Sequence, residues 1–168
     1  MNRTFDGLLE HYGEITMNKT KTNLEHSVEF LICEIIENYY RWSDSIKMKS
    51  GSSGQLANDN DARDVQAKEF KDGISYKVNN KYIKIYTTSK YGQKSVWGFV
   101  VRENDTVKCT HGMNGGNYFE RGDLMRARSW NQAETKYSVG NILNGTMDNV
   151  TKPNPDYPNY KTVWSGAR

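Results

Sequence analysis

The sequence predicts an α+β fold, in which one long amphipathic N-terminal helix packs on a mainly antiparallel β-sheet within a single domain. The prediction rests on a change in the apolar period along the chain. Apolar side chains recur every three or four positions between residues 24 and 46, whereas from residue 74 onward they recur at every second position. The length of 168 residues suits one ordinary domain.

The predicted helix lies in an N-terminal segment, residues 1–49. A single helical stripe is formed by Leu24, Val28, Leu31, Ile35, Tyr39, Trp42 and Ile46. Ile32 and Ile36 widen this stripe, so we expect the helix to pack on a sheet or on a second helix. Thr22 followed by Glu25 has the spacing of a capping box, which predicts that the helix begins here.

Residues 50–73 are predicted to form a polar connector. The stretch SGSSGQLANDNDARD is rich in small and polar residues and nearly free of apolar ones, which is typical of an exposed loop. The stretch DARDVQAKEF, residues 61–70, could add a short helix before the sheet begins.

Residues 74–168 are predicted to form the β-rich core of the same domain. ISYKV and KYIKIYTTS flank Asn79-Asn80, which suits a hairpin turn. KSVWGFVVRE is apolar on both faces, which indicates a central strand. Weaker strands are expected at TVKCT, at DLMRARS, where Leu124 and Met125 face opposite sides, and at KTVWS near residue 165.

Side chains alternate between the two faces of a strand, so each face can be assigned. On the second strand Ile83 and Ile85 share one face, and the opposite face carries Tyr82, Lys84 and Tyr86. Trp97 and Phe99 are two positions apart, so we expect them to share a face of the central strand and to be buried in the core.

The composition excludes several classes of protein. Only 36% of residues are hydrophobic, and no apolar run approaches the ~20 residues of a membrane span, so no membrane partner is expected. The first residues lack the apolar core of a secretory signal, and two cysteines form no disulfide framework. We therefore expect a reducing, intracellular setting.

No motif in the sequence predicts a cofactor, a metal site or catalysis. Cys109 and His111 offer two metal ligands where a structural zinc site needs four, and no base or oxyanion site accompanies the thiol. The glycine-rich GMNGGN lacks the lysine of a phosphate-binding P-loop. Asp123 follows Gly122, a pair that is more typical of a turn than of a catalytic site.

The charge distribution is the more informative signal. The net charge is only +3, yet residues 1–46 carry 4 basic and 8 acidic side chains, while residues 74–102 carry 6 basic and no acidic ones. Basic residues interleaved with aromatics suit phosphate contact and base stacking. The candidate nucleic-acid-binding residues are Lys81, Tyr82, Lys84, Tyr86, Lys94, Arg126 and Arg128. The alternative is an ordinary solvated sheet face.

Residues 68–168 contain an ordered set of short motifs. They are Lys81-Tyr82-Ile83-Lys84-Ile85, Ser95-Val96-Trp97-Gly98-Phe99, Gly122-Asp123, Ala127-Arg128-Ser129-Trp130, Gly140-Asn141-Ile142 and Trp164-Ser165-Gly166. In order and spacing the chain resembles a family of small, mostly uncharacterised proteins of tailed bacteriophages and large DNA viruses. The resemblance implies a viral protein and implies no known chemistry.

The chain departs from that family at three places. The family pattern SWKAP is SWNQAE here, ARGN is SVGN, and GMNGGNYFE is an insertion before the Gly-Asp pair. A lysine and an arginine of the family pattern are therefore missing, which puts any binding role of those two residues in doubt for this chain.

These observations predict a non-enzymatic, virus-encoded accessory protein that contacts nucleic acid through a basic, aromatic sheet face. It would act in the host-cell cytoplasm or in the virion. One alternative is a minor structural component of the virus particle or a protein that binds a host factor. A second alternative is an enzyme with an unrecognised site.

Overall fold

The computed structural model describes residues 21–46, 54–112, 115–145 and 166–167. Its elements, in chain order, are α2 (Asn23–Ile46), α3 (Gly54–Gly73), β1 (Ile74–Val78), β2 (Tyr82–Thr88), β3 (Lys94–Val101), β4 (Asp123–Met125), β5 (Ala127–Ser129), β6 (Gln132–Ala133) and β7 (Gly140–Asn141). The strand expected at KTVWS lies outside the described residues.

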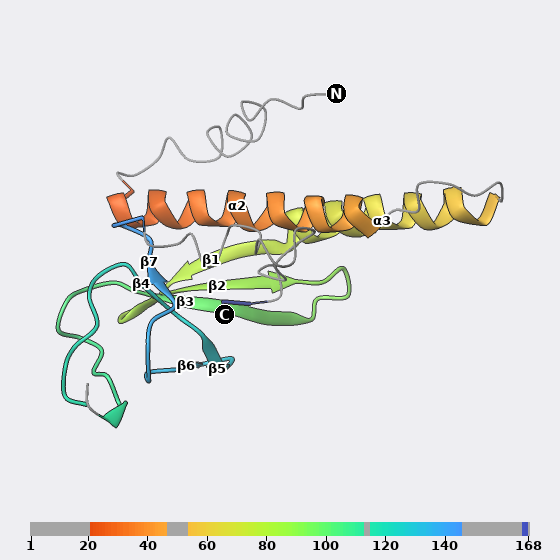
Figure 1. Ribbon diagram of the computed structural model, residues 1–168. Coiled ribbons are helices and arrows are strands. Elements are labelled where there is room, and N and C mark those ends of the chain that lie inside the picture. The colour runs from red at the N-terminus through yellow and green to blue at the C-terminus, as the bar shows by residue number, and fades with distance from the viewer. Residues whose placement is uncertain (1–20, 47–53, 113–114, 146–165, 168) are drawn as a thin grey trace.

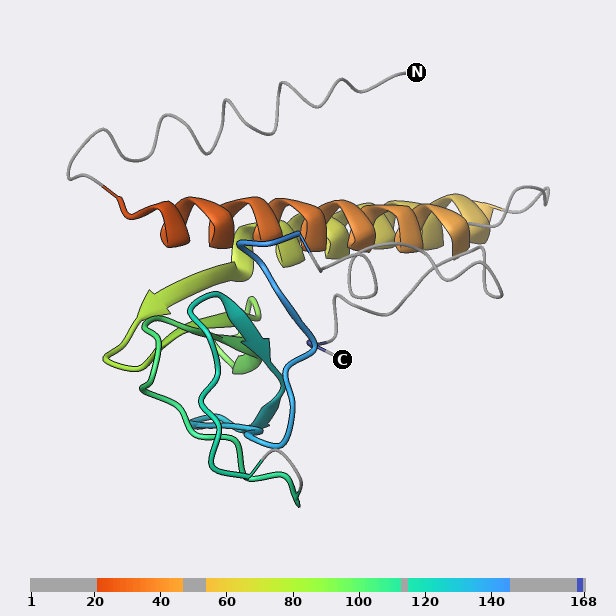
Figure 2. The same cartoon turned by 60° about the vertical axis from the view of Figure 1, so that its left-hand side comes forward.

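The architecture is two layers, a pair of helices on one face of an antiparallel sheet (Figure 1). The sheet has the strand order β1-β2-β3-β4-β7, and every pair in it is antiparallel. β5 and β6 form a separate two-stranded sheet on the side away from the helices (Figures 1 and 2). The predicted α+β class, with its long helix and antiparallel sheet in a single domain, is confirmed.

α2 begins and packs as its sequence pattern predicts. Thr22 Oγ1 accepts a hydrogen bond from the Glu25 backbone N–H at 3.3 Å, and Glu25 Oε2 accepts one from the Thr22 backbone N–H at 3.0 Å, which is the reciprocal capping box. The stripe enters the main core, which contains Leu24, Val28, Leu31, Ile32, Ile35, Ile36, Ile74, Ile83, Ile85, Trp97, Val100, Leu124 and Ala167. Burial of this stripe holds the helix on the sheet.

The segment expected to be a polar connector forms a helix that is longer than predicted. α3 spans Gly54–Gly73 and continues into β1 without a loop. It contributes Ala67 to the buried residues, and Phe70 stacks on Tyr39 of α2 with ring centroids 4.2 Å apart. These few contacts with α2, rather than an apolar stripe of its own, hold α3 in place, so the apolar pattern gave no sign of its length.

A β-bulge in β3 reverses the faces expected for its aromatic residues. Ile85 pairs with Gly98, and Tyr86 pairs with Val96, so Trp97 is the extra residue of the bulge. Trp97 therefore enters the main core under α2, whereas Phe99 lies in a second cluster of buried residues. Both rings are only 2% exposed, so the expected burial is confirmed, but the prediction that they share a face was wrong.

The second cluster lies on the opposite face of the sheet. It contains Phe99, Val101, Val107 and Met125, with Tyr82, Val96, Phe119, Ala127 and Ala133 packed around it. Leu124 belongs to the main core and Met125 to the second cluster, so the predicted opposition of these two residues is confirmed. The second cluster means that the face away from the helices is partly covered, which restricts where a surface site can lie.

The other predicted elements are reduced or displaced. The stretch TVKCT forms only an isolated bridge between Lys108 and Tyr118. The turn between β1 and β2 comprises Asn79, Asn80 and Lys81, and the Arg102 guanidinium donates to the backbone oxygens of Asn79 and Asn80 at 2.8 and 3.2 Å. In the described part of the chain, neither helix has the length and apolar character that crossing a bilayer requires.

Candidate functional site

Lys84 occupies an unusual position for a lysine. It lies on β2 between Ile83 and Ile85, which point into the main core, so its own side chain projects from the opposite face of the sheet. There the loop between β5 and β6 covers it, and the residue is only 8% exposed. Lys84 Nζ lies 4.2 Å from the ring centroid of Trp130 and donates to Asn131 Oδ1 at 3.3 Å.

The burial of Lys84 corrects one expectation from the sequence. A basic sheet face, whether it binds nucleic acid or is simply solvated, predicts cationic side chains that are exposed to water, and Lys84 instead lies between the rings of Trp130 and Phe99. Burial lowers the pKa of the Lys84 ammonium, and the nearby Lys77 ammonium lowers it further. Among the described residues no carboxylate forms an ion pair with Lys84, so its charge is balanced by aromatic rings and one amide oxygen.

Four further residues lie on the same face as Lys84 and complete a group that we name the cation–aromatic patch: Lys77, Lys84, Tyr86, Lys94 and Trp130. Lys77 on β1 is paired directly with Lys84 and is exposed. Tyr86 lies edge-on to Trp130, with ring centroids 5.9 Å apart and an interplanar angle of 70°. The Nζ of Lys94 lies 5.7 Å from the Tyr86 ring centroid.

The strand register explains why these side chains share a face. Directly paired residues of an antiparallel sheet project to the same side, so Lys77 lies on the same face as Lys84. Lys94 pairs with Thr88, which lies two positions from Tyr86 and hence on the same face. The patch thus draws one cation from each of three neighbouring strands, and its covering ring comes from the loop after β5.

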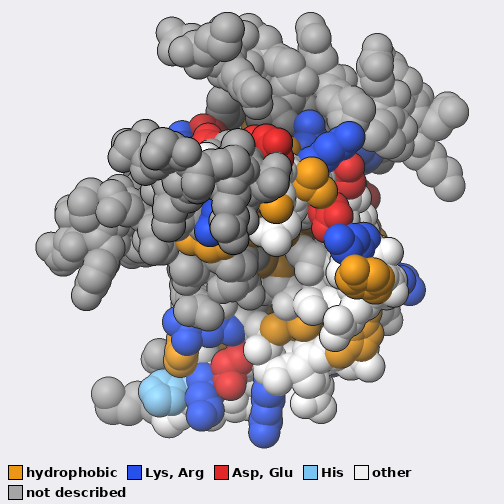
Figure 3. All heavy atoms as spheres, turned by 90° about the vertical axis from the view of Figure 1, so that its right-hand side faces the viewer, with side chains coloured by type: hydrophobic (Ala, Val, Ile, Leu, Met, Phe, Trp, Pro, Cys, Tyr) orange, Lys and Arg blue, Asp and Glu red, His pale blue; other side chains and the backbone are white. Residues whose placement is uncertain are grey.

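The three strands that carry the lysines of the patch contain no acidic residue. Residues 74–102, which form β1, β2 and β3, include no Asp or Glu. In the view of Figure 3, acidic side chains gather mainly in the upper part of the molecule, where the helices lie, and basic side chains reach the surface in the lower part as well. A row of cations without nearby carboxylates creates a local positive potential that attracts anions.

Two predicted site residues on or beside β2 are placed away from the patch. Lys81 lies in the turn before β2 and is exposed. Tyr82 packs edge-on against Phe99, with ring centroids 5.5 Å apart, and burial raises the pKa of its phenol. Tyr82 is therefore part of the second cluster, and Lys81 remains a surface cation at the end of the hairpin.

The two predicted arginines lie near and on β5. Arg126 Nη1 donates to Tyr137 Oη at 3.3 Å, and its guanidinium carbon lies 5.4 Å from the Tyr137 ring centroid. Arg128 is the extra residue of a bulge in β5 and is exposed. Arg126 is thus engaged with an aromatic partner of its own, and Arg128 is a surface cation two residues before Trp130.

Hydrogen bonds join the Gly122-Asp123 motif to the Gly140-Asn141 motif. Asn141 Nδ2 donates to Asp123 Oδ1 at 3.0 Å and to the Arg121 carbonyl at 3.1 Å, and Asn141 Oδ1 accepts from the Leu143 N–H at 2.9 Å. Asp123 Oδ2 accepts from the Glu120 N–H at 2.8 Å. These bonds join β4 to β7 and support the interpretation of Gly122-Asp123 as a turn.

A second pair of motifs meets at the bulge in β3. The Ala167 N–H donates to the Trp97 carbonyl at 2.8 Å, and Ala167 is 5% exposed. A Cβ at Gly98 would lie 3.0 Å from the Ala167 Cβ, so the segments approach closely there. Trp164 and Ser165 of the last motif lie outside the described residues.

Cys109 and His111 lie two positions apart but in different surroundings. Cys109 is buried and its thiol donates to the Lys136 carbonyl at 3.2 Å, whereas His111 is exposed. Within the described ranges no group of three His, Cys, Asp or Glu side chains could hold a metal ion.

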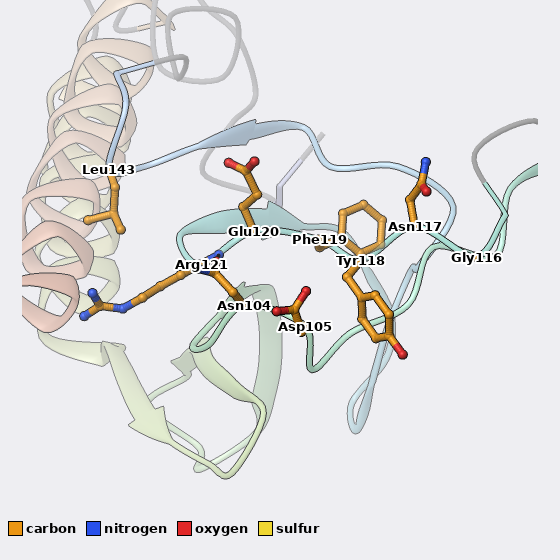
Figure 4. Close-up of a pocket in the computed structure, with 9 residues that line it drawn as sticks. All are labelled: Asn104, Asp105, Gly116, Asn117, Tyr118, Phe119, Glu120, Arg121 and Leu143. Carbon is orange, nitrogen blue, oxygen red and sulfur yellow. Dashed lines mark hydrogen bonds between the residues drawn. The ribbon is translucent and has the colours of Figure 1, made fainter.

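An open groove of about 830 Å³ lies elsewhere on the molecule. It is lined by Asn104, Asp105, Gly116, Asn117, Tyr118, Phe119, Glu120, Arg121 and Leu143 (Figure 4). Figure 4 shows the Glu120 carboxylate and the Arg121 guanidinium pointing in different directions, and Asn104 Oδ1 is occupied by the Arg121 N–H at 2.7 Å. Because these side chains do not converge, the groove is a weaker candidate than the cation–aromatic patch.

Sequence reasoning identified Lys84, Tyr86 and Lys94 but left out Lys77 and Trp130. The alternation of ISYKV places Lys77 on the same face as Lys84 once the hairpin is accepted, so that residue could have been found. The contact between Lys84 and Trp130 joins positions 46 apart in the chain, and nothing in the local pattern indicates it.

Comparison with protein-family models, curated proteins and solved structures gives no match.

Proposed function

We propose that this protein contacts nucleic acid through the cation–aromatic patch, acting as a binding protein rather than as an enzyme. The observation that carries the proposal is the Lys84 ammonium, which lies against Trp130 and Asn131 and has no carboxylate partner among the described residues. Covering the ammonium group with rings and no counter-charge disfavours its charged form, which is why the pKa of Lys84 is lowered. A phosphate oxygen beside Lys84 would supply that counter-charge and form a charge-assisted hydrogen bond.

The arrangement of the lysines favours a polymer over a small anion. Lys77, Lys84 and Lys94 stand on three neighbouring strands, and Lys94 pairs with Thr88, four positions beyond Lys84, so the Cα atoms of the outer two lysines lie roughly 16 Å apart. A nucleic-acid strand carries one phosphate about every 3.4 Å, so a single strand can neutralise all three cations at once. A free phosphate ion could contact only one or two of them.

The resemblance to proteins of tailed bacteriophages and large DNA viruses supports a viral setting for this activity. A virus-encoded accessory protein with a modest net charge of +3 would bind through a local concentration of cations rather than through its overall charge. Such binding is electrostatic in large part, so its affinity should decrease as the salt concentration increases.

The decisive variant is Lys84→Met, measured by fluorescence anisotropy with a labelled oligonucleotide. Met has a similar shape and no charge, so we expect the free energy of unfolding to stay the same or to increase. Loss of one charged hydrogen bond should weaken binding about tenfold or more. Lys108→Met is the matched control, because Lys108 lies over Tyr118, outside the patch, and its loss should leave the affinity close to that of the parent protein.

The exposed lysines provide an independent measurement. Removing two lysine–phosphate contacts should make the slope of log K against log salt concentration less steep by about 1.4 to 1.8. We expect this change in the double variant Lys77→Gln/Lys94→Gln, whose fold should be unaffected because both side chains are exposed. Unchanged affinity of Lys84→Met, together with an unchanged salt slope in the double variant, would disprove the proposed function.

A further inference from the structure

We infer that the patch binds single-stranded nucleic acid and that Trp130 is the platform on which an unpaired base stacks. The inference rests on the proposed function and specifies its substrate. Trp130 and Asn131 form the loop between β5 and β6, since Ser129 pairs with Gln132. The indole is 38% exposed although the hairpin that carries it packs against the second cluster.

The position of the indole is fixed from two sides. The Lys84 ammonium lies over its ring at 4.2 Å from the centroid, and the Tyr86 ring meets it at 70°. A cation on an aromatic face is attracted by the ring quadrupole, and the edge-to-face contact adds a second orienting interaction. Trp130 is therefore held in one orientation before any ligand arrives, which reduces the entropy lost on binding.

An exposed, oriented indole beside three lysines matches the two requirements of single-strand binding. The lysines follow the phosphate backbone, and the ring accepts a base regardless of its identity, because every base has a π-face. In a duplex the faces of the bases are stacked on one another and only their edges reach the grooves. A stacking platform therefore distinguishes unpaired bases from paired ones, whereas lysines alone would not.

Lys84 links the two parts of the site. The Lys84 ammonium contacts the Trp130 indole, and Lys84 pairs with the exposed Lys77 on β1. The phosphates that flank a base stacked on Trp130 would therefore lie close to cations. Asn131 Oδ1 accepts a hydrogen bond from Lys84 and helps to hold that ammonium beneath the loop. Removing the indole would thus remove the stacking surface while leaving all three lysines in the chain.

The test compares Trp130→Ala with the parent protein on three ligands of equal length: a thymidine oligonucleotide, a duplex, and an abasic single strand that keeps its phosphates. Stacking of one base predicts a loss of about 5- to 150-fold for the thymidine oligonucleotide. We expect less than about a twofold change for the duplex and for the abasic strand, because neither presents an unpaired base. Trp130→Phe should retain most of the affinity for the thymidine oligonucleotide.

Tyr91→Ala is the control for loss of an aromatic side chain. Tyr91 is 86% exposed in the turn between β2 and β3, with Lys90 over its ring, so the change should leave all three affinities as they are. Equal losses on the thymidine oligonucleotide and the duplex would overturn the single-strand inference but leave the proposed function intact. Absence of binding to all three ligands by the parent protein would instead contradict the proposed function.

Discussion

Substituting Gly122 by Ala tests whether the turn before β4 is as tightly constrained as the structure describes. Gly122 has a φ of +93°, a conformation that residues with a side chain rarely adopt. An added Cβ would lie 2.8 Å from Asn141 Oδ1 and 2.8 Å from Leu143 Cγ. The Leu143 side chain is exposed and can move aside, whereas Asn141 is 5% exposed and held by its hydrogen bonds.

The expected cost of Gly122→Ala has two parts. The backbone conformation itself costs about 1 to 3 kcal/mol for a residue other than glycine. Relieving the contact requires Asn141 to shift, and loss of one of its hydrogen bonds adds about 0.5 to 1.5 kcal/mol. The reduced freedom of the unfolded chain offsets about 0.4 to 1 kcal/mol of this. We therefore expect the free energy of unfolding to decrease by about 0.5 to 4 kcal/mol, with a central value of about 2 kcal/mol, which lowers Tm by roughly 4 to 8 °C at that central value.

The measurement is urea unfolding followed by circular dichroism, with Gly92→Ala as the matched control. Gly92 also has a positive φ, +79°, but an added Cβ there meets nothing within 4 Å. The control should show the backbone cost alone, and the difference between the two variants reports the contact with Asn141. Equal unfolding free energies for the two variants would refute the close approach of Gly122 and Asn141.

Two further predictions concern the main core and the start of α2. Trp97→Ala should lower the free energy of unfolding by about 3 to 5 kcal/mol, because it empties a buried site; a cost below about 1 kcal/mol in urea unfolding would be inconsistent with an inward-facing bulge. The hydrogen bond from the Thr22 backbone N–H lowers the pKa of Glu25 in the folded protein below its value of 4.5 in the unfolded chain. The ionised carboxylate therefore stabilises the fold above pH 4.5, and this stabilisation is lost as the pH falls through the lower, folded-state pKa. Glu25→Gln should therefore lose less stability than the parent protein in denaturation series from pH 6 to pH 3, and parallel pH curves would contradict the capping role.

The elements with a strong local pattern could be predicted from the sequence. The stripe from Leu24 to Ile46 and its capping box gave α2, and the alternation around Ile83 and Ile85 gave β2 with its two faces. In both, the apolar period alone determines which side is buried. α3 has no comparable stripe, so only part of it was anticipated.

The bulge at Trp97 could not be predicted, because the assignment of faces assumes that side chains alternate without interruption. A bulge inserts one extra residue and reverses the faces on one side of it. A single extra residue moved Trp97 to the side opposite Phe99 while the letters SVWGFVV still fitted an unbroken strand. The burial of Lys84 has a similar cause. A lysine on a polar strand face is expected in water, and only the contact with a loop 46 positions further along shows that it is covered.

The hydrogen bond from Ala167 to Trp97 affects how the protein can fold while it is being synthesised. β1, β2 and β3 form consecutive hairpins and can pair as soon as they leave the ribosome, because their contacts are local. The residue that covers the backbone at Gly98 is 69 positions further along the chain. α2 precedes the sheet in the chain and can cover most of this face early, so what stays exposed until Ala167 emerges is the small area around Gly98, where aggregation can begin.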